Sequence, residues 1–263
     1  VFEGIRYGIT EGGITEIMRE RMTYFGIEVG GKQHVEFTVL GDDLEAMRAA
    51  RFALEPLMFP REPERVMPEI AAYMRIVAPT RMASRAYLSD IELTIREGQF
   101  WRLPATYRDL VQNTVGASGP TRKNGRWSMS ITLLNLPDED PDARVAAIMR
   151  VLAPFGLSLG EFATKEGRAP ISRWDTPLFA LIAKEAQRRF DVAAGPQILY
   201  RSATDSRFLR ARGIVCYGVA PYRVTYYESI SIHHGDERVR IPAFQEGIAF
   251  MRQVVATWAR GTA

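Results

Sequence analysis

The last hundred residues alternate between segments typical of helices and segments typical of strands. A helix predicted over Thr176–Phe190 is followed by the apolar strand QILYRS, a short helix that begins near TDSR, and the buried strand IVCYGVA. Gly213 is expected to end the short helix, because glycine readily takes the left-handed backbone found at helix C-termini. The closing segment has helical spacing, and its predicted inner side carries Phe244, Met251, Val254, Val255 and Trp258. This alternation predicts an α/β fold with a mostly parallel sheet covered by helices.

Two strands with one buried face are predicted in the middle of the chain. Residues 32–40 place Val35, Phe37 and Val39 at alternate positions between polar neighbours. Residues 127–134 show the same alternation. A period of two residues is typical of a strand that packs one face on a core and leaves the other toward solvent.

Helices are expected between and after these strands. Residues 42–112 are rich in arginine, methionine and leucine and are interrupted by prolines, which predicts several short helices. One further helix and one further strand are predicted before residue 165. We therefore expect an α+β module over residues 32–165, between outer segments 1–31 and 166–263.

Composition excludes several classes of protein. The 34 basic and 31 acidic residues are interspersed, so the net charge of +3 does not predict nucleic-acid binding. Cys216 is the single cysteine and lies in an apolar run, so we expect it in the core of a cytoplasmic protein. No apolar stretch approaches the roughly 18 residues of a membrane span, and no signal peptide is visible. The sequence begins with Val1, and we expect either a processing site or a missing N-terminal part there.

Two of the three histidines, His233 and His234, are adjacent in the segment SIHHGDERV. In sheets covered by helices, ligand sites lie in the loops that follow the carboxyl ends of strands. Both TDSR and SIHHGDERV are predicted to be such loops. The sequence therefore predicts a ligand site formed by these two segments.

Three motifs occur in an order found in a known family. They are ITEGG near the start, TDSRFLRARGI, and HHGDERV before a terminal helix. In this order the chain resembles the two-zinc hydrolases that include aminoacylase, carboxypeptidase G, peptidase T and succinyl-diaminopimelate desuccinylase. The resemblance implies a zinc-binding α/β catalytic domain into which an α+β lid, residues 32–165, is inserted. Lids of this kind pair two subunits, so the resemblance also implies a dimer.

The resemblance assigns two metal ligands. His233 occupies the position of a terminal ligand of one zinc ion, and Glu11 that of a ligand of the other, whereas His234 is a neighbour. Two zinc ions about 3.5–4 Å apart can hold a bridging water and polarise a scissile carbonyl. Asp236 or Glu237 is the expected acceptor for the second ring nitrogen of His233. From the residues alone, Glu11 also fits an ordinary turn residue.

The same resemblance implies a small amide substrate with a free carboxylate, such as a peptide or an N-acyl amino acid. Thr204, Asp205 and Arg207 are the predicted substrate-binding residues, and Arg207 would hold the carboxylate. The alternative for Arg207 is an exposed helix residue that forms a local salt bridge.

The chain departs from the family in what it lacks. The H-x-D pair, the bridging aspartate and the Glu-Glu pair, which precede the EGG motif in the family, are absent. The predicted lid has no histidine after its first strand. The family has an asparagine just before the second lid strand, and Asn124 matches it only if the alignment is shifted. Leu134 occupies the position in that strand where an arginine is expected. The chain therefore holds about two of the five protein ligands of such a site.

Three interpretations follow. The chain is the C-terminal portion of a zinc amide hydrolase completed by a separate N-terminal chain, a noncatalytic scaffold or regulatory subunit of a larger complex, or a piece of an ordinary hydrolase. The first is preferred because both ligand motifs are retained. We also expect a dimer or larger complex in which HVEFTVL forms the pairing edge of the lid sheet.

Overall fold

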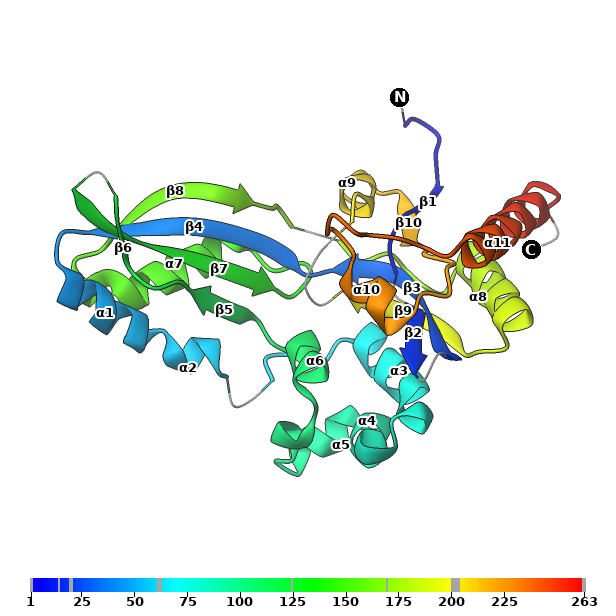
Figure 1. Cartoon of the computed structure of the whole chain (residues 1–263), viewed down its shortest axis with the longest axis horizontal. Coiled ribbons are helices and arrows are strands. Elements are labelled where there is room, and N and C mark those ends of the chain that lie inside the picture. Colours follow the sequence, from blue (N-terminus) through cyan, green and yellow to red (C-terminus); the bar gives the residue numbers. More distant parts are fainter. Residues whose placement is uncertain are drawn as a thin grey trace.

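The computed structural model describes residues 2–13, 15–18, 21–60, 63–123, 125–168, 170–199 and 204–261. Two five-stranded sheets lie one after the other along the long axis of the molecule, each with its own helices (Figure 1). The predicted α/β fold is confirmed. The prediction of a mostly parallel sheet is wrong, because two of the four strand pairings described in the first sheet are antiparallel, and the alternation of helices and strands along the chain does not determine strand direction. None of the helices described is both long enough and apolar enough to span a membrane.

The first sheet combines strands from both ends of the chain. Its strands are β1 (Tyr7–Thr10), β2 (Thr15–Met18), β3 (Arg21–Gly31), β9 (Ala194–Leu199) and β10 (Val215–Gly218). β10 lies between β1 and β3, parallel to β1 and antiparallel to β3. β3 also pairs in parallel with β9 and antiparallel with β2. This order brings the end of β1 and the end of β10 next to the middle of β3, where Gly218 pairs with Glu28.

The helices fall into three groups. Beside the second sheet lie α1 (Leu44–Ala53), α2 (Glu55–Met58) and α7 (Pro141–Leu152). The next group contains α3 (Pro68–Val77), α4 (Arg85–Ser89), α5 (Ile91–Arg96) and α6 (Ala105–Arg108). The C-terminal group contains α8 (Pro177–Phe190), α9 (Ser206–Arg210), α10 (Tyr226–Ile230) and α11 (Ile241–Ala259).

Helices cover both faces of the first sheet. On one face Phe25 of β3 contacts Phe190 of α8 and Phe250 of α11, with ring centroids 5.5 and 5.3 Å away. On the other face Tyr24 contacts Tyr73 of α3 at 5.2 Å. Adjacent residues of a strand point to opposite faces, and both Tyr24 and Phe25 are fully buried. β3 therefore buries apolar side chains on both faces, as expected of a strand between two helical layers.

The second sheet contains β4 (Gln33–Gly41), β5 (Thr114–Ala117), β6 (Thr121–Lys123), β7 (Arg126–Asn135) and β8 (Ser158–Lys165). Val35, Phe37 and Val39 of β4 are fully buried, as the alternation predicted. The prediction that HVEFTVL forms an edge is wrong, because β4 pairs with β7 on one side and β8 on the other. A strand buried on its inner face can lie anywhere in a sheet, and here β8 is the edge strand next to β4.

The predicted lid range contains two packing units. Its first and last parts form a core of their own between the second sheet, α1 and α7. Residues 67–111, from α3 to α6, instead bury their apolar side chains in the core of the first sheet. The connection from α2 therefore returns the chain to the first sheet before β5 re-enters the second.

The closing helix has a different inner face from the predicted one. Val254 is buried, and Met251 and Trp258 pack at the border of the core, but Phe244 is 44% and Val255 57% exposed. The prediction for these last two residues is wrong. α11 turns about 100° per residue, and the core contacts only the sector that carries Phe250 and Val254.

Candidate functional site

The EGG motif forms a tight turn after β1. Gly12 and Gly13 have φ angles of 125° and 79°, which residues other than glycine rarely adopt. A Cβ on Gly13 would lie 2.5 Å from the carbonyl oxygen of Gly26 and 3.1 Å from that of Gly218. Because both oxygens belong to the backbone of paired strands, they cannot move aside without distorting the sheet. The glycines let the chain turn closely over β3 and β10, with Glu11 at the start of the turn.

Gly13→Ala is expected to lower the free energy of unfolding by about 2 kcal/mol, from left-handed strain and overlap with backbone together. Gly98 offers a matched control, since it has a φ of 66° and a Cβ added there would have open space for 4 Å around it. Gly98→Ala should cost only about 1 kcal/mol, from the backbone strain alone. Urea unfolding followed by circular dichroism measures both, and equal costs would contradict the close approach.

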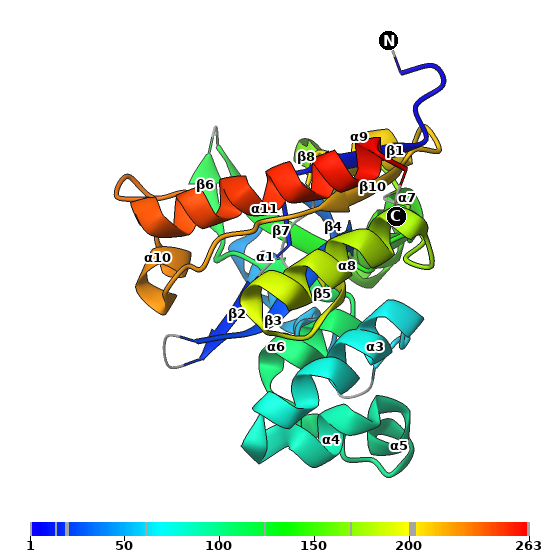
Figure 2. The same ribbon diagram turned by 90° about the vertical axis from the view of Figure 1, so that its right-hand side faces the viewer.

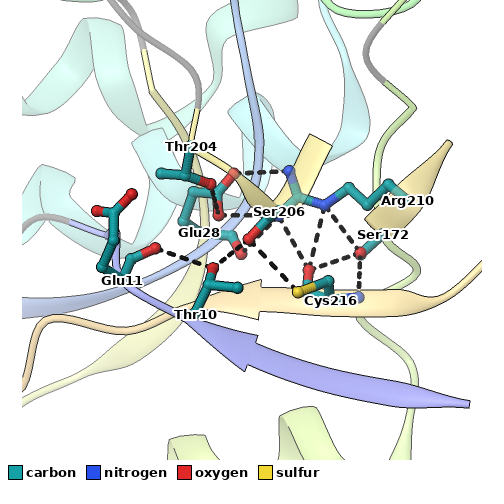
Figure 3. Close-up of polar contacts among 8 residues, drawn as sticks. All are labelled: Thr10, Glu11, Glu28, Ser172, Thr204, Ser206, Arg210 and Cys216. Carbon is teal, nitrogen blue, oxygen red and sulfur yellow. Dashed lines mark hydrogen bonds and ion pairs between the residues drawn. The ribbon is translucent and has the colours of Figure 1, made fainter. Parts of the chain in front are cut away.

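A buried ion pair lies directly beneath this turn. Glu28 of β3 and Arg210 of α9 are 0% and 3% exposed at their side chains and form two charge-assisted hydrogen bonds, of 2.7 and 2.8 Å (Figure 3). Thr204 donates a further hydrogen bond to Glu28 Oε2 at 3.2 Å. A Cβ on Gly218 would overlap the Glu28 carboxylate. The pair therefore joins β3, the end of β10 and the loop before α9.

Arg210 also binds the segment before α8. Its guanidinium donates to the carbonyl oxygen of Cys216 at 2.9 Å and to Ser172 Oγ at 3.1 Å. The backbone N–H of Cys216 donates to the same Ser172 oxygen at 2.9 Å. Sequence reasoning missed both Glu28 and Arg210. The available signal was a glutamate in the strand FGIEVGG, where an apolar residue is expected on either face.

A second polar chain ties β1 to α9. The Cys216 thiol donates to Ser206 Oγ at 3.4 Å, Ser206 is hydrogen-bonded to Thr10 Oγ1, and Thr10 donates to the backbone carbonyl of Glu11 at 3.0 Å. Cys216 is fully buried, as predicted. Figure 3 shows Glu11 at the border of this network, with its carbonyl bound to Thr10. The backbone of Glu11 is therefore held, while its carboxylate stays outside the network.

The electrostatics of Glu11 bring the three sequence motifs together. Partial burial raises the pKa of its carboxyl, the nearby charges of Glu28 and Asp205 raise this pKa further, and His233 lowers it. Asp205 belongs to the TDSR loop and His233 to the HHGDE loop. Both predicted ligands, Glu11 and His233, thus lie within electrostatic reach of each other at one end of the first sheet.

The histidine loop has a strained backbone at the predicted ligand. His233 has a φ of 65°, and its N–H donates to Glu237 Oε2 at 2.9 Å. Glu237 was a candidate acceptor for the imidazole, but it accepts from the backbone of His233 instead. Asp236, the other candidate, forms an ion pair with Arg238 at 3.1 Å. The loop geometry therefore fixes the backbone of His233 and leaves its exposed ring to other partners.

The predicted substrate-binding residues have different surroundings. Thr204 is buried against Glu28, and Asp205 is exposed beside the first turn of α9. Arg207 forms an ion pair with Glu166, just beyond β8, and stacks over the ring of Phe208 at 4.6 Å. Glu166 also accepts the backbone N–H of His34 at 2.8 Å. Arg207 thus makes a salt bridge to the second sheet, which differs from the local one considered from the sequence.

The described part of the chain does not fit a complete zinc centre. Among its residues, no three His, Cys, Asp or Glu side chains are close enough together to hold a metal ion. Glu11 and His233 have suitable donor atoms, but structural and catalytic zinc sites need at least three protein ligands. Asn124, the predicted lid asparagine, lies outside the described residues.

Comparisons with known proteins identify the fold. No protein-family model and no curated protein sequence matches the chain. Dug1p, a dipeptidase from Saccharomyces cerevisiae, matches 96% of this chain with a TM-score of 0.63 and 12% sequence identity. Sso-CP2, an M20 family metallo-carboxypeptidase from Sulfolobus solfataricus, matches 88% with a TM-score of 0.56 and 16% identity. The chain shares its fold with these peptidases. At 12% and 16% sequence identity, these matches support the resemblance inferred from the motifs at the level of the fold.

The match covers only part of each peptidase. This chain spans 59% of the length of Dug1p and 59% of that of Sso-CP2. The remaining part of those folds aligns with no part of this chain.

Proposed function

We propose that the chain is the C-terminal portion of a zinc-dependent metallopeptidase or amidohydrolase, of the carboxypeptidase or aminoacylase type, completed by a separate N-terminal polypeptide. The main support is that the charges of Asp205 and His233, from two other motifs, act on the carboxyl of Glu11 at the end of β1, in a fold shared with two peptidases. In folds with helices on both faces of a sheet, this is where ligands bind.

Within this proposal the chain contributes two ligand positions and their support. Glu11 and His233 would each bind one of two zinc ions, and the polypeptide that completes the fold would supply the other ligands and the general base. The buried Glu28–Arg210 pair and the Thr10–Ser206 bond would keep the EGG turn and the TDSR loop in place. Positioning of this kind matters because metal ligands must be held closely to their required geometry.

The proposed substrate is a small peptide or N-acyl amino acid with a free carboxylate. Arg207 is the proposed carboxylate-binding group, and its guanidinium is already paired with Glu166. A substrate carboxylate would therefore replace Glu166 in this pair. Such an exchange would couple substrate binding to the connection between the two sheets.

A noncatalytic role is the second candidate. The absence of a three-residue metal-binding group among the described residues favours a peptidase-like scaffold or regulatory subunit. The two candidates differ in one measurable property, because only the first requires metal at Glu11 and His233 in the assembled protein.

That two subunits pair through their lid sheets stays a prediction, but the strand at the pairing edge is now β8. β8 is the edge strand beside β4, and it exposes Leu159 and Phe162, which are 42% and 37% accessible. Exposed edges that carry apolar side chains tend to be covered. We propose that a dimer would pair through β8 in place of the HVEFTVL strand.

The proposal is tested on the assembled protein. Native mass spectrometry identifies a second polypeptide, and the zinc content of the complex is then measured with its hydrolysis of dipeptides and N-acetyl amino acids. His233→Ala is expected to lose zinc and most activity, because the ring is a proposed ligand, whereas the isolated 263-residue chain is expected to be inactive.

His234→Ala is the matched control, since His234 is adjacent and also exposed. It is expected to retain most of the zinc. Equal zinc loss in both variants would contradict the assignment of His233 as a zinc ligand. An assembled complex that binds no zinc would favour the scaffold role.

A further inference from the structure

One side of α11 is apolar and largely exposed among the described residues, although Phe244 stacks on the ring of Tyr222 at 5.9 Å. Ile241, Phe244, Ile248 and Val255 are 72%, 44%, 43% and 57% exposed. At about 100° per residue, these four positions fall within roughly 60° of one another around the helix axis. Together they form a continuous apolar stripe, here called the outer stripe of α11.

The stripe is distinct from the faces that a surface helix normally has. The buried face of α11 carries Phe250 and Val254, which pack into the core of the first sheet. An ordinary exposed sector also exists, with Gln245 and Arg252. A helix that needed to bury only one face would have polar residues everywhere else. The outer stripe therefore indicates a second packing surface.

The edge of the first sheet lies beside this helix. Among the described residues β1 pairs only with β10, so its other edge is open. Tyr7 of β1 contacts Trp258 of α11 edge to face at 5.3 Å, which joins strand and helix. In Figure 2, α8 lies along one side of α11, and β1 and the N-terminal segment lie toward the other. Phe2 and Ile5, which precede β1, are also 45% and 46% exposed.

Two observations define what would cover this surface. Dug1p and Sso-CP2 contain chain beyond the 59% that this protein matches, so their common fold has more elements than are present here. The site at the end of β1 also lacks a third ligand among the described residues. An occupant that extends the sheet from β1 would bring new side chains next to Glu11, which directly follows β1.

We propose that the outer stripe of α11 and the open edge of β1 together form the docking surface for the polypeptide that completes the peptidase fold. The proposal rests on the proposed function for the identity of this polypeptide. The partner adds a strand to β1 by backbone hydrogen bonds and covers Ile248 and Val255 with an apolar helix face. Strand addition of this kind satisfies the unpaired backbone groups of an edge.

Photocrosslinking in the cells that produce the protein tests this surface. Benzoylphenylalanine is introduced at position 248 in α11 and, as a matched control, at position 52 in α1, where Phe52 is equally apolar and 70% exposed. The crosslinked product from position 248 is expected to contain a polypeptide with the H-x-D and Glu-Glu motifs. Position 52 is expected to give no such product.

Substitution provides the second measurement. Ile248→Arg is expected to weaken the complex roughly 30-fold, as loss of a central apolar contact does, whereas Phe52→Arg leaves it unchanged. Both side chains are exposed in the chain alone, so circular dichroism of each variant should match the parent. A product from position 248 that contains only a second copy of this chain, a polypeptide without those motifs, or no product at all would overturn the proposal.

The outcomes separate docking from function. A complex that crosslinks at position 248 and carries no metal-dependent hydrolysis supports the docking surface and contradicts the proposed function. A complex that hydrolyses dipeptides and is unaffected by Ile248→Arg overturns the docking surface and leaves the function in place.

Discussion

Arg210→Met is expected to lower the free energy of unfolding by about 3–5 kcal/mol, because it leaves the Glu28 carboxylate buried without its counter-charge. Glu28 is fully buried, and among the described residues its remaining side-chain donor would be Thr204 at 3.2 Å. The carbonyl oxygen of Cys216 would also lose hydrogen bonds from the guanidinium, of 2.9 and 3.2 Å. Urea denaturation with circular dichroism measures the change.

Two controls test the cause of this loss. The double variant Glu28→Leu/Arg210→Met removes both charges, and it should recover most of the lost stability because apolar residues can replace a buried pair at little cost. Arg212→Met alters an exposed arginine whose side chain, within the described part of the chain, donates a hydrogen bond to the carbonyl of Phe208, and its effect should stay within about 0.5 kcal/mol. An Arg210→Met variant that loses less than about 1 kcal/mol would contradict the role of the pair.

The sequence predicted the elements of the fold better than their arrangement. Alternation in residues 32–40 and 127–134 correctly located β4 and β7, because a strand with one buried face carries a local period of two. The position of β4 in the centre of its sheet was not predictable in this way. Pairing order depends on contacts between residues distant in the chain, and β8, which covers the other side of β4, lies more than a hundred residues later.

Helix periodicity had a similar limit in α11. The spacing correctly indicated an amphipathic helix, but it could not distinguish a side chain that faces this chain's core from one that faces outward. Phe244 and Val255 are apolar and exposed, while Phe250 is apolar and buried. An apolar stripe shows that a surface is suited to packing, and only the fold shows whether the chain itself provides the partner.

The candidate site was predictable where it depends on glycine and on loops. Gly12 and Gly13 have the positive φ angles that a Gly-Gly turn indicates, and the loops containing Asp205 and His233 reach the same end of the sheet as Glu11. The support beneath them was not predictable. A single buried glutamate in β3 has no local pattern that identifies its partner, and Arg210 lies 182 residues away.

A buried lysine at the junction of the two sheets provides a separate test of the fold. Lys32, between β3 and β4, is fully buried, and its Nζ has no hydrogen-bond partner among the described residues. Burial lowers the pKa of Lys32 to about 8, and the attraction of Asp109 and Glu64 offsets only part of this shift. The folded state therefore binds this proton more weakly than the unfolded state, where the pKa is about 10.4.

Lys32→Met is expected to stabilise the chain by about 3 kcal/mol at pH 7, because it replaces a buried ammonium with an apolar side chain of similar length. Below pH 8 the parent carries the full penalty of burying this charge. As pH rises from about 8 to about 10.4, the unfolded chain still binds the proton that the folded chain has released, so the parent gains stability relative to the variant and the difference disappears. Urea unfolding of both proteins at pH 7, 9 and 10.5 measures this convergence, with the exposed Lys184→Met as a control that should change stability by less than about 0.5 kcal/mol at each pH. If Lys32→Met destabilised the chain at pH 7, or shifted its stability equally at all three pH values, Lys32 would have a partner that holds its charge in the folded state.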